Sequence, residues 1–381
     1  MKKKIKIMPI FGTRPEAIKM APVIAELNKS PEFETVVVVT AQHREMLDQV
    51  LELFKITPAF DLNIMSNGQT LSQITARVLE GMDTILESVR PDMVLVHGDT
   101  TTTFAAALAA YYRKIPTGHV EAGLRTLNKY SPYPEEMNRK LAGSLSDLHF
   151  APTQSAKENL IREGISSERI IITGNTVIDA LLGVVGLTYD FSGTQLEAVD
   201  FEHKRVILIT SHRRENIGNP MIEIFTAVKN IITANQDVEV VFPVHKNPIV
   251  RGIANDILKG LDRVHLIEPL DYLPFANLMG RCYMIMTDSG GIQEEAPSLG
   301  KPVLVLRDTT ERPEALNAGT AKLAGTDAGS IVTHVKRLLD DKVEYARMAN
   351  AANPYGDGKA ANRIVKALAD YFAAIPGYNA E

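Results

Sequence analysis

The sequence predicts an α/β protein with two doubly wound domains, each a parallel sheet covered by helices on both faces. Short apolar runs rich in β-branched residues alternate with amphipathic helical segments along the chain, which is the pattern of parallel strands joined by crossover helices. The alternation is interrupted once, at 183–204, by a loosely patterned segment with scattered Gly, Ser and Thr. A chain of 381 residues is long enough for two domains of about 100–200 residues each.

The first half of the chain contains a series of runs with strand character. They lie at 5–11, 35–40, 92–97, 117–121, 148–151 and 170–173. The amphipathic segments between them include 15–28, 72–89 and 101–112. At the start of the first of these helices, Thr13 and Glu16 form the T-x-x-E pattern of a capping box.

The second half repeats the alternation after the interruption. Its strand-like runs lie at 206–210, 238–243, 264–267, 283–287 and 303–306. We therefore expect a first domain at 1–180 and a second at 181–358. A last helix at 359–372 follows the turn-rich segment NPYGDG, and we expect the segment 359–381 to return to the first domain.

The composition restricts the partners and the compartment. A net charge of −5 gives no electrostatic reason to expect a nucleic-acid partner. The single cysteine, Cys282, excludes an intrachain disulfide and fits a reducing compartment. The Lys-rich start leads into a short apolar run that contains Lys6 and is followed at once by Arg14, so we interpret it as a strand and not as an export signal. Since no apolar run reaches about 18 residues, we expect a cytoplasmic protein without a membrane span.

Three carboxylates follow successive predicted strands of the first domain. Asp99 stands in HGDTTTT, Glu121 ends the run at 117–121, and Glu135 starts a helix after PYP. Each has a purely structural alternative: Asp99 could cap the next helix, Glu121 could pair with Arg125, and Glu135 could be favoured by the helix dipole in the first turn of its helix. Because carboxyl ends of parallel strands meet at one edge of a sheet, the three together indicate a catalytic cluster.

Basic residues follow the first strand of each domain. Arg14 stands at a helix N-terminus, with Lys19 about a turn further on. In the second domain, His212 and Arg213 follow the strand at 206–210, and His245 lies in a further strand-end turn. Solvated surface is the alternative interpretation, but the positions favour phosphate binding by Arg and proton transfer by His.

The segment TDSGGIQEEAPSLGKPVLVLRDTTERPEA provides the strongest ligand signal. Gly290 and Gly291, after Ser289, let the backbone approach a bulky group, and the N–H groups that open the next helix form an anion site. Glu295 lies one turn into that helix, within reach of a hydroxyl beside the anion. Phe275 offers an aromatic ring for a base. A phosphate beside a polyol indicates a nucleotide or a nucleotide sugar.

Several other site classes are disfavoured. No G-x-G-x-x-G follows the first strand, which argues against a nicotinamide or flavin site. The histidines of the strand-end turns are too separated for a metal site, and no G-x-S-x-G nucleophile motif occurs. We therefore expect no metal and no cofactor. The tetrad RPEA recurs at 312–315, which we interpret as a second helix that starts with Pro.

The motifs as a set resemble those of the bacterial non-hydrolysing UDP-N-acetylglucosamine 2-epimerases. They are FGTRPEAIKMAP, TAQHREMLDQVL, HGDTTTT, GHVEAGLRT, YSPYPEEMNR, TGNTVIDAL, HRREN and the long segment above, in the family's order along nearly the whole chain. The resemblance implies two Rossmann-like domains facing a cleft, as in glycosyltransferase-B-like folds, and a homodimer. It also implies reversible conversion of UDP-GlcNAc to UDP-ManNAc, which supplies ManNAc for cell-envelope polysaccharide.

The same resemblance gives roles to individual residues. It implies that Asp99, Glu121, Glu135 and His212 are catalytic. For UDP, the residues and the resemblance together indicate Arg14, Lys19, Arg213, His245, Phe275, Ser289, Gly290, Gly291 and Glu295. Members of the family also bind a second UDP-GlcNAc as an allosteric activator, and the matching segments contain Gln42, His43 and Gln69.

The chemistry requires such a set of residues. The hydrogen on carbon 2 becomes acidic only when the anomeric C–O bond breaks, so UDP leaves first and a 2-acetamidoglucal forms. Cationic groups and N–H donors hold the departing diphosphate, while carboxylates on two faces of the ring act as base and acid. The alternatives are a glycosyltransferase of the same fold, a hydrolysing epimerase that releases ManNAc and UDP, and a catalytically silent UDP-sugar sensor.

Overall fold

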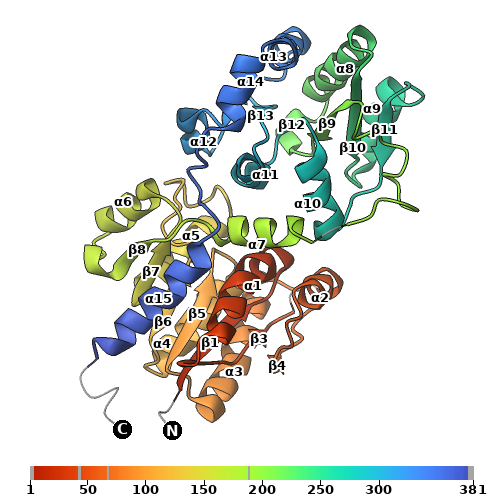
Figure 1. Cartoon of the computed structure of the whole chain (residues 1–381). Helices are drawn as coiled ribbons and strands as arrows, with labels where there is room; N and C mark the ends of the chain where they lie inside the picture. The colour runs from red at the N-terminus through yellow and green to blue at the C-terminus, as the bar shows by residue number, and fades with distance from the viewer. Residues whose placement is uncertain (1–3, 42–43, 67, 188, 376–381) are drawn as a thin grey trace. The chain divides into compact units, whose positions relative to one another are not determined.

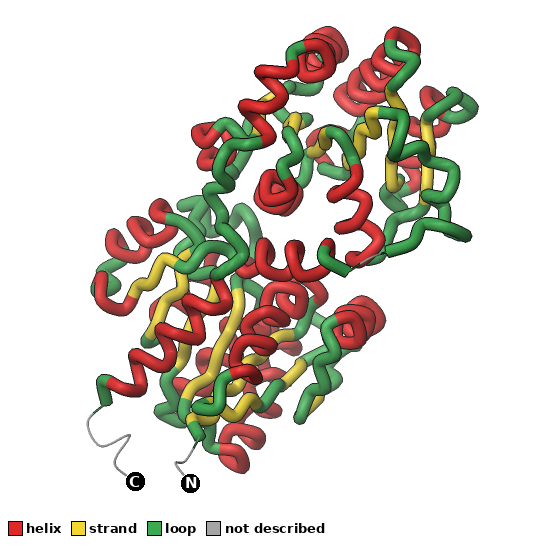
Figure 2. The backbone as a smooth tube through the Cα atoms, viewed as in Figure 1, coloured by secondary structure: helices red, strands yellow, loops and turns green. Residues whose placement is uncertain are grey.

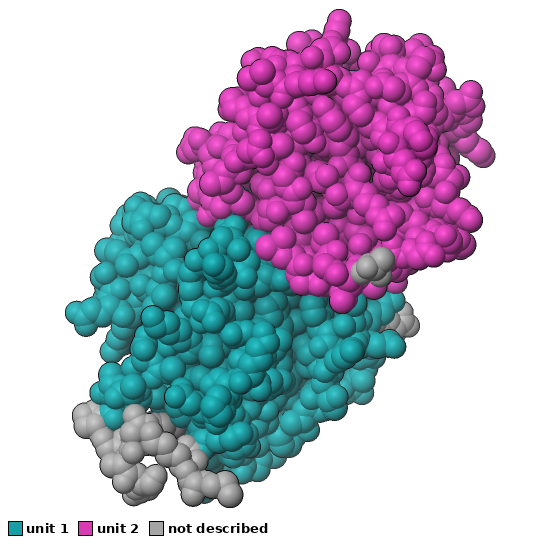
Figure 3. All heavy atoms as spheres, in the orientation of Figure 1, with its two compact units in different colours: residues 1–180, 355–381 teal, residues 181–354 magenta. Residues whose placement is uncertain are grey.

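The computed structural model describes residues 4–41, 44–66, 68–187 and 189–375. The chain divides into two compact units (Figure 3): unit 1 comprises residues 1–180 and 355–381, and unit 2 comprises residues 181–354. Within each unit, strands are enclosed by helices (Figure 2). Both sheets are parallel, so the predicted fold class of two α/β domains with parallel sheets is confirmed.

The sheet of unit 1 has the strand order β4-β3-β1-β5-β6-β7-β8, and β2 pairs with the first part of β1. The strands are β1 (Ile5–Phe11), β2 (Phe33–Thr35), β3 (Val38–Val39), β4 (Phe60–Asp61), β5 (Met93–His97), β6 (Thr117–Val120), β7 (Leu148–Ala151) and β8 (Ile170–Ile172). Chain order reverses between β1 and β5. Doubly wound folds bind ligands beyond the carboxyl ends of the strands at such a reversal, so the turns after β1 and β5 mark the candidate site of this unit.

Helices cover both faces of this sheet. They are α1 (Arg14–Lys29), α2 (Arg44–Leu53), α3 (Leu71–Val89), α4 (Thr101–Tyr112), α5 (Glu135–Leu145), α6 (Gln154–Arg162), the 3₁₀ turn η1 (Ser167–Arg169), α7 (Thr176–Val185), which continues into unit 2, and α15 (Ala360–Ala373). On one face, side chains of β1 and β5 such as Ile10 and Val96 are buried against α3 and α4. Each fully buried side chain of this size stabilises the fold by about 1.5–3 kcal/mol.

The last helix lies beside the first in unit 1. α15 packs against α1, and Figure 1 shows the blue helix alongside the red one. Asp179 accepts hydrogen bonds from the backbone N–H groups of Ala360 (3.2 Å) and Ala361 (2.9 Å). A carboxylate at this position satisfies N–H groups that a helix N-terminus leaves unpaired and complements the helix dipole.

Unit 2 repeats the design with a smaller sheet in the order β11-β10-β9-β12-β13-β14. Its strands are β9 (Arg205–Thr210), β10 (Val238–Pro243), β11 (Val264–Ile267), β12 (Met284–Thr287), β13 (Val303–Val305) and β14 (Ala321–Leu323). Its helical segments are η2 (Arg214–Asn216), α8 (Asn219–Ala234), α9 (Pro248–Leu258), α10 (Tyr272–Arg281), α11 (Gly290–Glu295), η3 (Ala296–Leu299), α12 (Pro313–Ala318), α13 (Ala328–Asp340) and α14 (Lys342–Ala349). Here the order reverses between β9 and β12, and the turns after these two strands mark the candidate site.

The structure differs from the predicted elements in three places. The run at 35–40 forms two short strands, because β2 pairs with residues 5–7 of β1 and β3 with residues 10–11. The strands β4 and β14 were not predicted, since two or three residues are too few to show a periodic pattern. Glu121 lies just beyond β6, which ends at Val120. In the part of the chain that the structure describes, no helix is both long and apolar enough to cross a membrane.

Candidate active site

The Glu121 carboxylate lies beyond β6 and contacts the first helix of unit 1. Nζ of Lys19, in α1, donates a hydrogen bond to Oε2 of Glu121. Both side chains are largely buried, with 20% of Lys19 and 10% of Glu121 exposed. Glu121 has a φ of +61°, a left-handed conformation that is uncommon for residues other than glycine and that occurs often at functional sites. The backbone of unit 1 is therefore strained at the point where this carboxylate is placed.

Asp99 lies in the turn after β5 and is paired with α5. Nη2 of Arg139 donates to its carboxylate at 2.5 Å, and Nδ2 of Asn138 donates to its backbone carbonyl at 3.0 Å. Burial raises the pKa of Asp99, Arg139 opposes that rise, and the negative charges of Glu121 and Glu135 add to it. Because these charges act on Asp99, the three predicted carboxylates share one region of unit 1.

A buried carboxylate connects the turns that carry these residues. Glu16, which is 3% exposed, accepts hydrogen bonds at Oε2 from the backbone N–H groups of Gly12 (3.0 Å) and Thr13 (2.8 Å). At Oε1 it accepts from the hydroxyls of Thr100 (2.7 Å) and Thr103 (3.2 Å). The predicted capping box is present, and the same carboxylate also fixes the turn after β5 against the turn after β1.

The structural alternatives for two of the carboxylates are wrong. Arg125 forms a bidentate pair with Glu163, with N–O distances of 2.9 and 2.6 Å, and does not serve Glu121. The N-cap of α4 is Thr100 and not Asp99. Glu135 does occupy the first turn of α5, as its alternative proposed. Asp99 and Glu121 are thus held at strand ends by Arg139 and Lys19, and not by the cap or the Arg125 pair that the structural alternatives named.

In unit 2, Asp288 organises the turn after β9. This carboxylate is fully buried, and Oδ2 accepts from the backbone N–H groups of His212 (2.8 Å) and Arg213 (2.9 Å). The same oxygen accepts from Oγ of Ser211 (3.2 Å) and Nδ2 of Asn216 (3.1 Å). Four donors to one oxygen fix the His-Arg turn against the end of β12.

The imidazole of His212 lies at the edge of this arrangement. Its Nδ1 is 3.3 Å from Oδ1 of Asp288, and 39% of the side chain is exposed. Its ring stacks on the ring of His245, with a centroid distance of 5.7 Å and an interplanar angle of 20°. Burial lowers the pKa of His212, and Asp288 opposes that change. The ring is therefore mainly neutral near pH 7 and can accept or donate a proton.

Two guanidinium groups flank the Ser-Gly-Gly turn after β12. A Cβ at Gly290 would lie 3.5 Å from Nη2 of Arg312 and 3.9 Å from Nη2 of Arg213. Arg312 also donates to Glu294 within α11. At Gly291, which is exposed, an added Cβ would lie 3.5 Å from Oε1 of Glu295. The turn combines a close backbone approach with positive charge, which is the chemistry that binds a phosphate.

Comparison with known proteins decides the family. A family model described as UDP-N-acetylglucosamine 2-epimerase matches residues 25–369. The UDP-N-acetylglucosamine 2-epimerase of Bacillus subtilis is 56% identical over 379 residues, which cover 100% of this chain and 98% of that protein. The chain belongs to the UDP-N-acetylglucosamine 2-epimerase family. The enzyme of the same name from Escherichia coli K12 is 57% identical and covers 96% of this chain and 98% of its own length.

Solved structures of the epimerase family have the same fold. The Neisseria meningitidis UDP-GlcNAc 2-epimerase bound to UDP-GlcNAc is 52% identical, with a TM-score of 0.85 over 96% of this chain and 100% of that one. The Methanocaldococcus jannaschii enzyme in complex with UDP-GlcNAc and UDP is 35% identical, with a TM-score of 0.76 over the same shares of the two chains. A glycotransferase of kitacinnamycin, 12% identical with a TM-score of 0.62, shows likeness of fold alone.

The remaining predicted site residues have individual positions in the two units. Gln69 precedes α3 and accepts a hydrogen bond from Arg77 at 3.3 Å, while Gln42 and His43 lie outside the described residues. Phe275 is half-buried and lies in the first turn of α10, which begins at Tyr272. Arg14 is the first residue of α1 and is half-buried.

Sequence reasoning missed Asp288, Arg312 and the wider role of Glu16. Asp288 had a local signal, because it stands directly after an apolar strand and before Ser-Gly-Gly. Arg312 starts a helix in an RPEA tetrad, as Arg14 does, and this parallel could have indicated a second basic helix start at a ligand site. The bonds of Glu16 to Thr100 and Thr103 join positions more than 80 residues apart, for which the sequence has no local signal.

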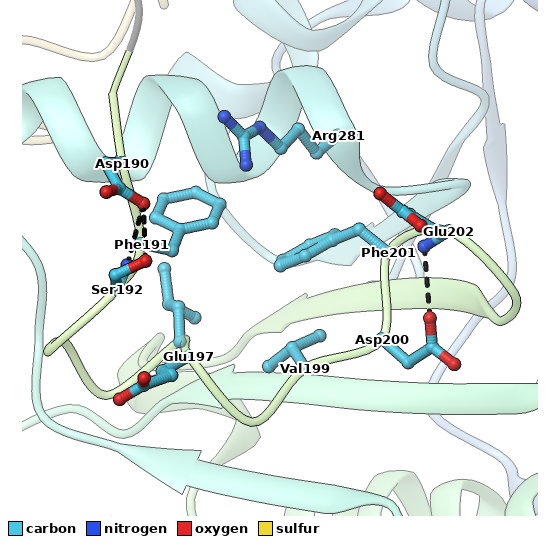
Figure 4. A pocket seen from close by; sticks show the side chains of 10 residues that line it. Asp190, Phe191, Ser192, Glu197, Val199, Asp200, Phe201, Glu202 and Arg281 are labelled. Carbon is cyan, nitrogen blue, oxygen red and sulfur yellow. Dashed lines mark hydrogen bonds between the residues drawn. The ribbon is translucent and has the colours of Figure 1, made fainter.

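A pocket of about 300 Å³ lies in unit 2 beside the connecting segment. Figure 4 shows Phe191 and Phe201 between its acidic side chains, with Arg281 reaching in from α10. The Arg281 guanidinium lies 4.5 Å from the centroid of Phe191, and Asp190 accepts two hydrogen bonds from Ser192. These contacts hold the connecting segment on α10, and none of the predicted site residues lines the pocket.

Proposed function

We propose that this protein interconverts UDP-GlcNAc and UDP-ManNAc by inversion at carbon 2, without hydrolysis. Membership of the epimerase family supports the overall reaction. The observation that carries the proposal is the carboxylate cluster of unit 1, in which Asp99 and Glu121 are each paired with a cation and Glu135 acts on Asp99. Binding a UDP-sugar does not require a carboxylate cluster, whereas moving a proton between two faces of a sugar ring requires a base on one face and an acid on the other.

The proposed reaction proceeds by elimination and addition. The anomeric C–O bond breaks and its electron pair leaves with UDP, while a carboxylate removes the proton from carbon 2, giving a 2-acetamidoglucal. A second acid returns a proton to carbon 2 from the opposite face, and UDP adds again to carbon 1. General acid–base catalysis of this kind contributes typically about 10²–10⁴-fold. UDP and the glucal must both be retained until addition is complete.

In this proposal, unit 2 holds UDP. The Ser289 turn and Arg213 bind the diphosphate, and Arg312 adds charge beside Gly290. Glu295 binds the ribose hydroxyls and Phe275 lies by the uracil. The mainly neutral imidazole of His212 is suited to proton transfer, and the ring of His245 stacked on it can form hydrogen bonds beside the leaving diphosphate.

Unit 1 performs the proton chemistry. Lys19 and Arg14 neutralise the diphosphate as it leaves, and Glu121, Asp99 and Glu135 act as base and acid on carbon 2. The pKa of Asp99 is raised by its surroundings, which favours the protonated form that an acid needs. The reaction requires no metal and no nicotinamide.

The family resemblance extends the proposal beyond the reaction. The protein acts as a cytoplasmic homodimer whose product supplies ManNAc for cell-envelope polysaccharide. A second molecule of UDP-GlcNAc activates it through the segments that contain Gln42, His43 and Gln69.

Incubation with UDP-GlcNAc in D₂O, in the presence of EDTA, tests the proposal by NMR. The expected product is UDP-ManNAc at equilibrium with UDP-GlcNAc, with deuterium at carbon 2 of both. Free ManNAc and UDP as main products would instead show a hydrolysing epimerase. A protein that binds UDP but never exchanges the hydrogen on carbon 2 would be a UDP-sugar sensor or a transferase that needs an acceptor, and the proposal would be wrong.

A further inference from the structure

His97, the last residue of β5, is a buried polar residue that the proposed reaction does not use. Its side chain is 4% exposed. Within the described residues, neither of its ring nitrogens has a hydrogen-bond partner. The large majority of buried side-chain polar atoms in proteins have one, and an exception in a native structure calls for an explanation.

The nearest charged group is the carboxylate of Glu121. Nε2 of His97 lies 3.8 Å from Oε2 of Glu121, which is beyond hydrogen-bond length. The same oxygen accepts the hydrogen bond of Lys19. The other carboxylate oxygen lies toward the turn, since a Cβ at Gly98 would be 3.8 Å from Oε1. The carboxylate is thus enclosed by the end of β5 on one side and by α1 on the other.

The imidazole of His97 is neutral at physiological pH. The pKa of His97 is lowered to about 4, mainly by burial; Glu121 opposes this change and the positive charge of Lys19 adds to it. The charged groups around it are Lys19 of α1 and Glu121 of the turn after β6. Asp99 lies in the turn after β5, and Glu135 and Arg139 of α5 act on Asp99. A neutral ring donates one N–H and cannot form an ion pair, so a hydrogen bond is the one direct interaction that it can offer Glu121.

The backbone beside His97 is fixed by a second histidine. Nε2 of His119, on β6, lies 2.7 Å from the carbonyl oxygen of Gly98. Since a carbonyl only accepts, Nε2 of His119 carries the proton. This bond holds the residue after His97 while leaving the His97 ring free of hydrogen bonds, so a small movement of the ring or of Glu121 is enough to bring the two together.

We propose that His97 is a positioning residue for Glu121, whose N–H bonds this carboxylate when Lys19 turns to the diphosphate of the substrate. The inference rests on the proposed function, in which Lys19 binds UDP and Glu121 exchanges a proton with carbon 2. Departure of Lys19 takes one donor away from the buried Glu121 carboxylate, and each hydrogen bond lost from a buried charge is costly. Closing the 3.8 Å separation to an ordinary N–H···O length of about 2.9 Å needs a shift of roughly 0.9 Å.

Three variants test this role, with pure UDP-GlcNAc as substrate. H97F removes both ring nitrogens, H97Q keeps an N–H donor, and H149F replaces a buried histidine of β7 as a control for packing. We expect H97F to lower kcat by about 10–100-fold through misplacement of Glu121, with the Kd for UDP changed less than about twofold. The acid limb of kcat should move to higher pH by about one pH unit, because loss of a donor raises the pKa of a carboxylate.

The conservative variant and the control decide between positioning and packing. H97Q should restore the acid limb and most of kcat, and H149F should lower the melting temperature without moving the limb. The inference is wrong if H97F keeps the wild-type limb, if H97F raises KM at constant kcat, or if H149F shifts the limb as H97F does.

A ligand-free measurement separates this inference from the proposed reaction. In the background of Lys19→Met, which mimics the departure of Lys19, the carboxyl ¹³C shift of Glu121 is titrated with and without H97F. The pKa of Glu121 should be about one unit higher in the double variant, since one donor has been removed. An equal pKa overturns the role of His97 even if the wild type turns over. Failure of wild-type exchange in D₂O overturns the reaction and leaves this titration to judge His97.

Discussion

Two substitutions at Asp288 should separate stability from catalysis in unit 2. D288A removes the acceptor of four hydrogen bonds, among them those of the His212 and Arg213 backbone N–H groups. D288N keeps a carbonyl oxygen in the place of Oδ2 and puts an amide NH₂ in the place of Oδ1. The first variant should damage the fold of the turn, and the second should preserve it.

The magnitudes follow from the contacts of the buried carboxylate. A buried donor left unpaired costs about 1–3 kcal/mol, and D288A removes the acceptor of four donors. We expect D288A to lower the free energy of unfolding of unit 2 by about 3–5 kcal/mol. For D288N we expect a loss of about 1–1.5 kcal/mol, because its acceptor makes neutral instead of charge-assisted bonds.

D288N should lower kcat strongly although it changes the stability little. A carboxylate oxygen 3.3 Å from Nδ1 of His212 favours the proton on Nδ1 and leaves Nε2 as an acceptor. The amide of D288N favours the other tautomer, so kcat should fall on the order of 10²-fold or more with a nearly wild-type melting curve, as an Asp-to-Asn change does in serine proteases.

Urea denaturation, monitored by circular dichroism, measures the stability of each variant. The NMR exchange assay measures kcat. D288A with a wild-type melting curve would refute the idea that Asp288 holds the turn. D288N with wild-type kcat would refute the assignment of the His212 tautomer, and equal loss of stability in both variants would show that charge alone matters.

Three further predictions follow from unit 1. E121Q should bind UDP with an affinity near that of the wild type, by calorimetry, and lose at least about 10³-fold in turnover, since an amide cannot take a proton; normal turnover would remove Glu121 from the mechanism. G12A should destabilise unit 1 by about 1–3 kcal/mol in a denaturation titration, because the added Cβ would lie 2.1 Å from Oγ1 of Thr40; an unchanged midpoint would contradict this close approach. Burial lowers the pKa of His97 and His149 to about 4 in the folded protein, whereas a histidine in the unfolded chain has a pKa of about 6.5. Between these two pH values the unfolded chain binds more protons than the folded protein. The stability present above pH 6.5 should therefore be lost as pH falls to 4, by roughly 1.4 kcal/mol per pH unit for each residue. H149F should make this pH dependence shallower, and an identical slope would contradict the neutral, buried state of that ring.

The sequence predicted strand ends well because each central strand is an apolar run closed by a turn signal. The residues after β1, β5, β9 and β12 were found in this way, and they include most of the candidate site. Parallel sheets bring such positions together by topology, so their common location could be expected without knowledge of any side-chain contact.

Contacts between distant side chains could not be predicted. The partner of Arg125 is Glu163, 38 residues away, and not the nearby Glu121. Asp288 reaches donors more than 70 residues earlier in the chain. Local rules describe which residues suit a turn or a cap, but they do not say which of several cations will meet a given carboxylate when strands far apart in sequence become neighbours.

The packing of α15 on α1 has a consequence for synthesis of the chain. Unit 2 is inserted between residue 180 and residue 355, so a ribosome completes the whole of it before α15 emerges. Until then the face of α1 that α15 covers is exposed, and Asp179 lacks the hydrogen bonds that the N–H groups of Ala360 and Ala361 donate in the folded protein. A nascent chain stalled before residue 355 should therefore bind chaperones that recognise apolar helix surfaces, and release them once the last helix has docked.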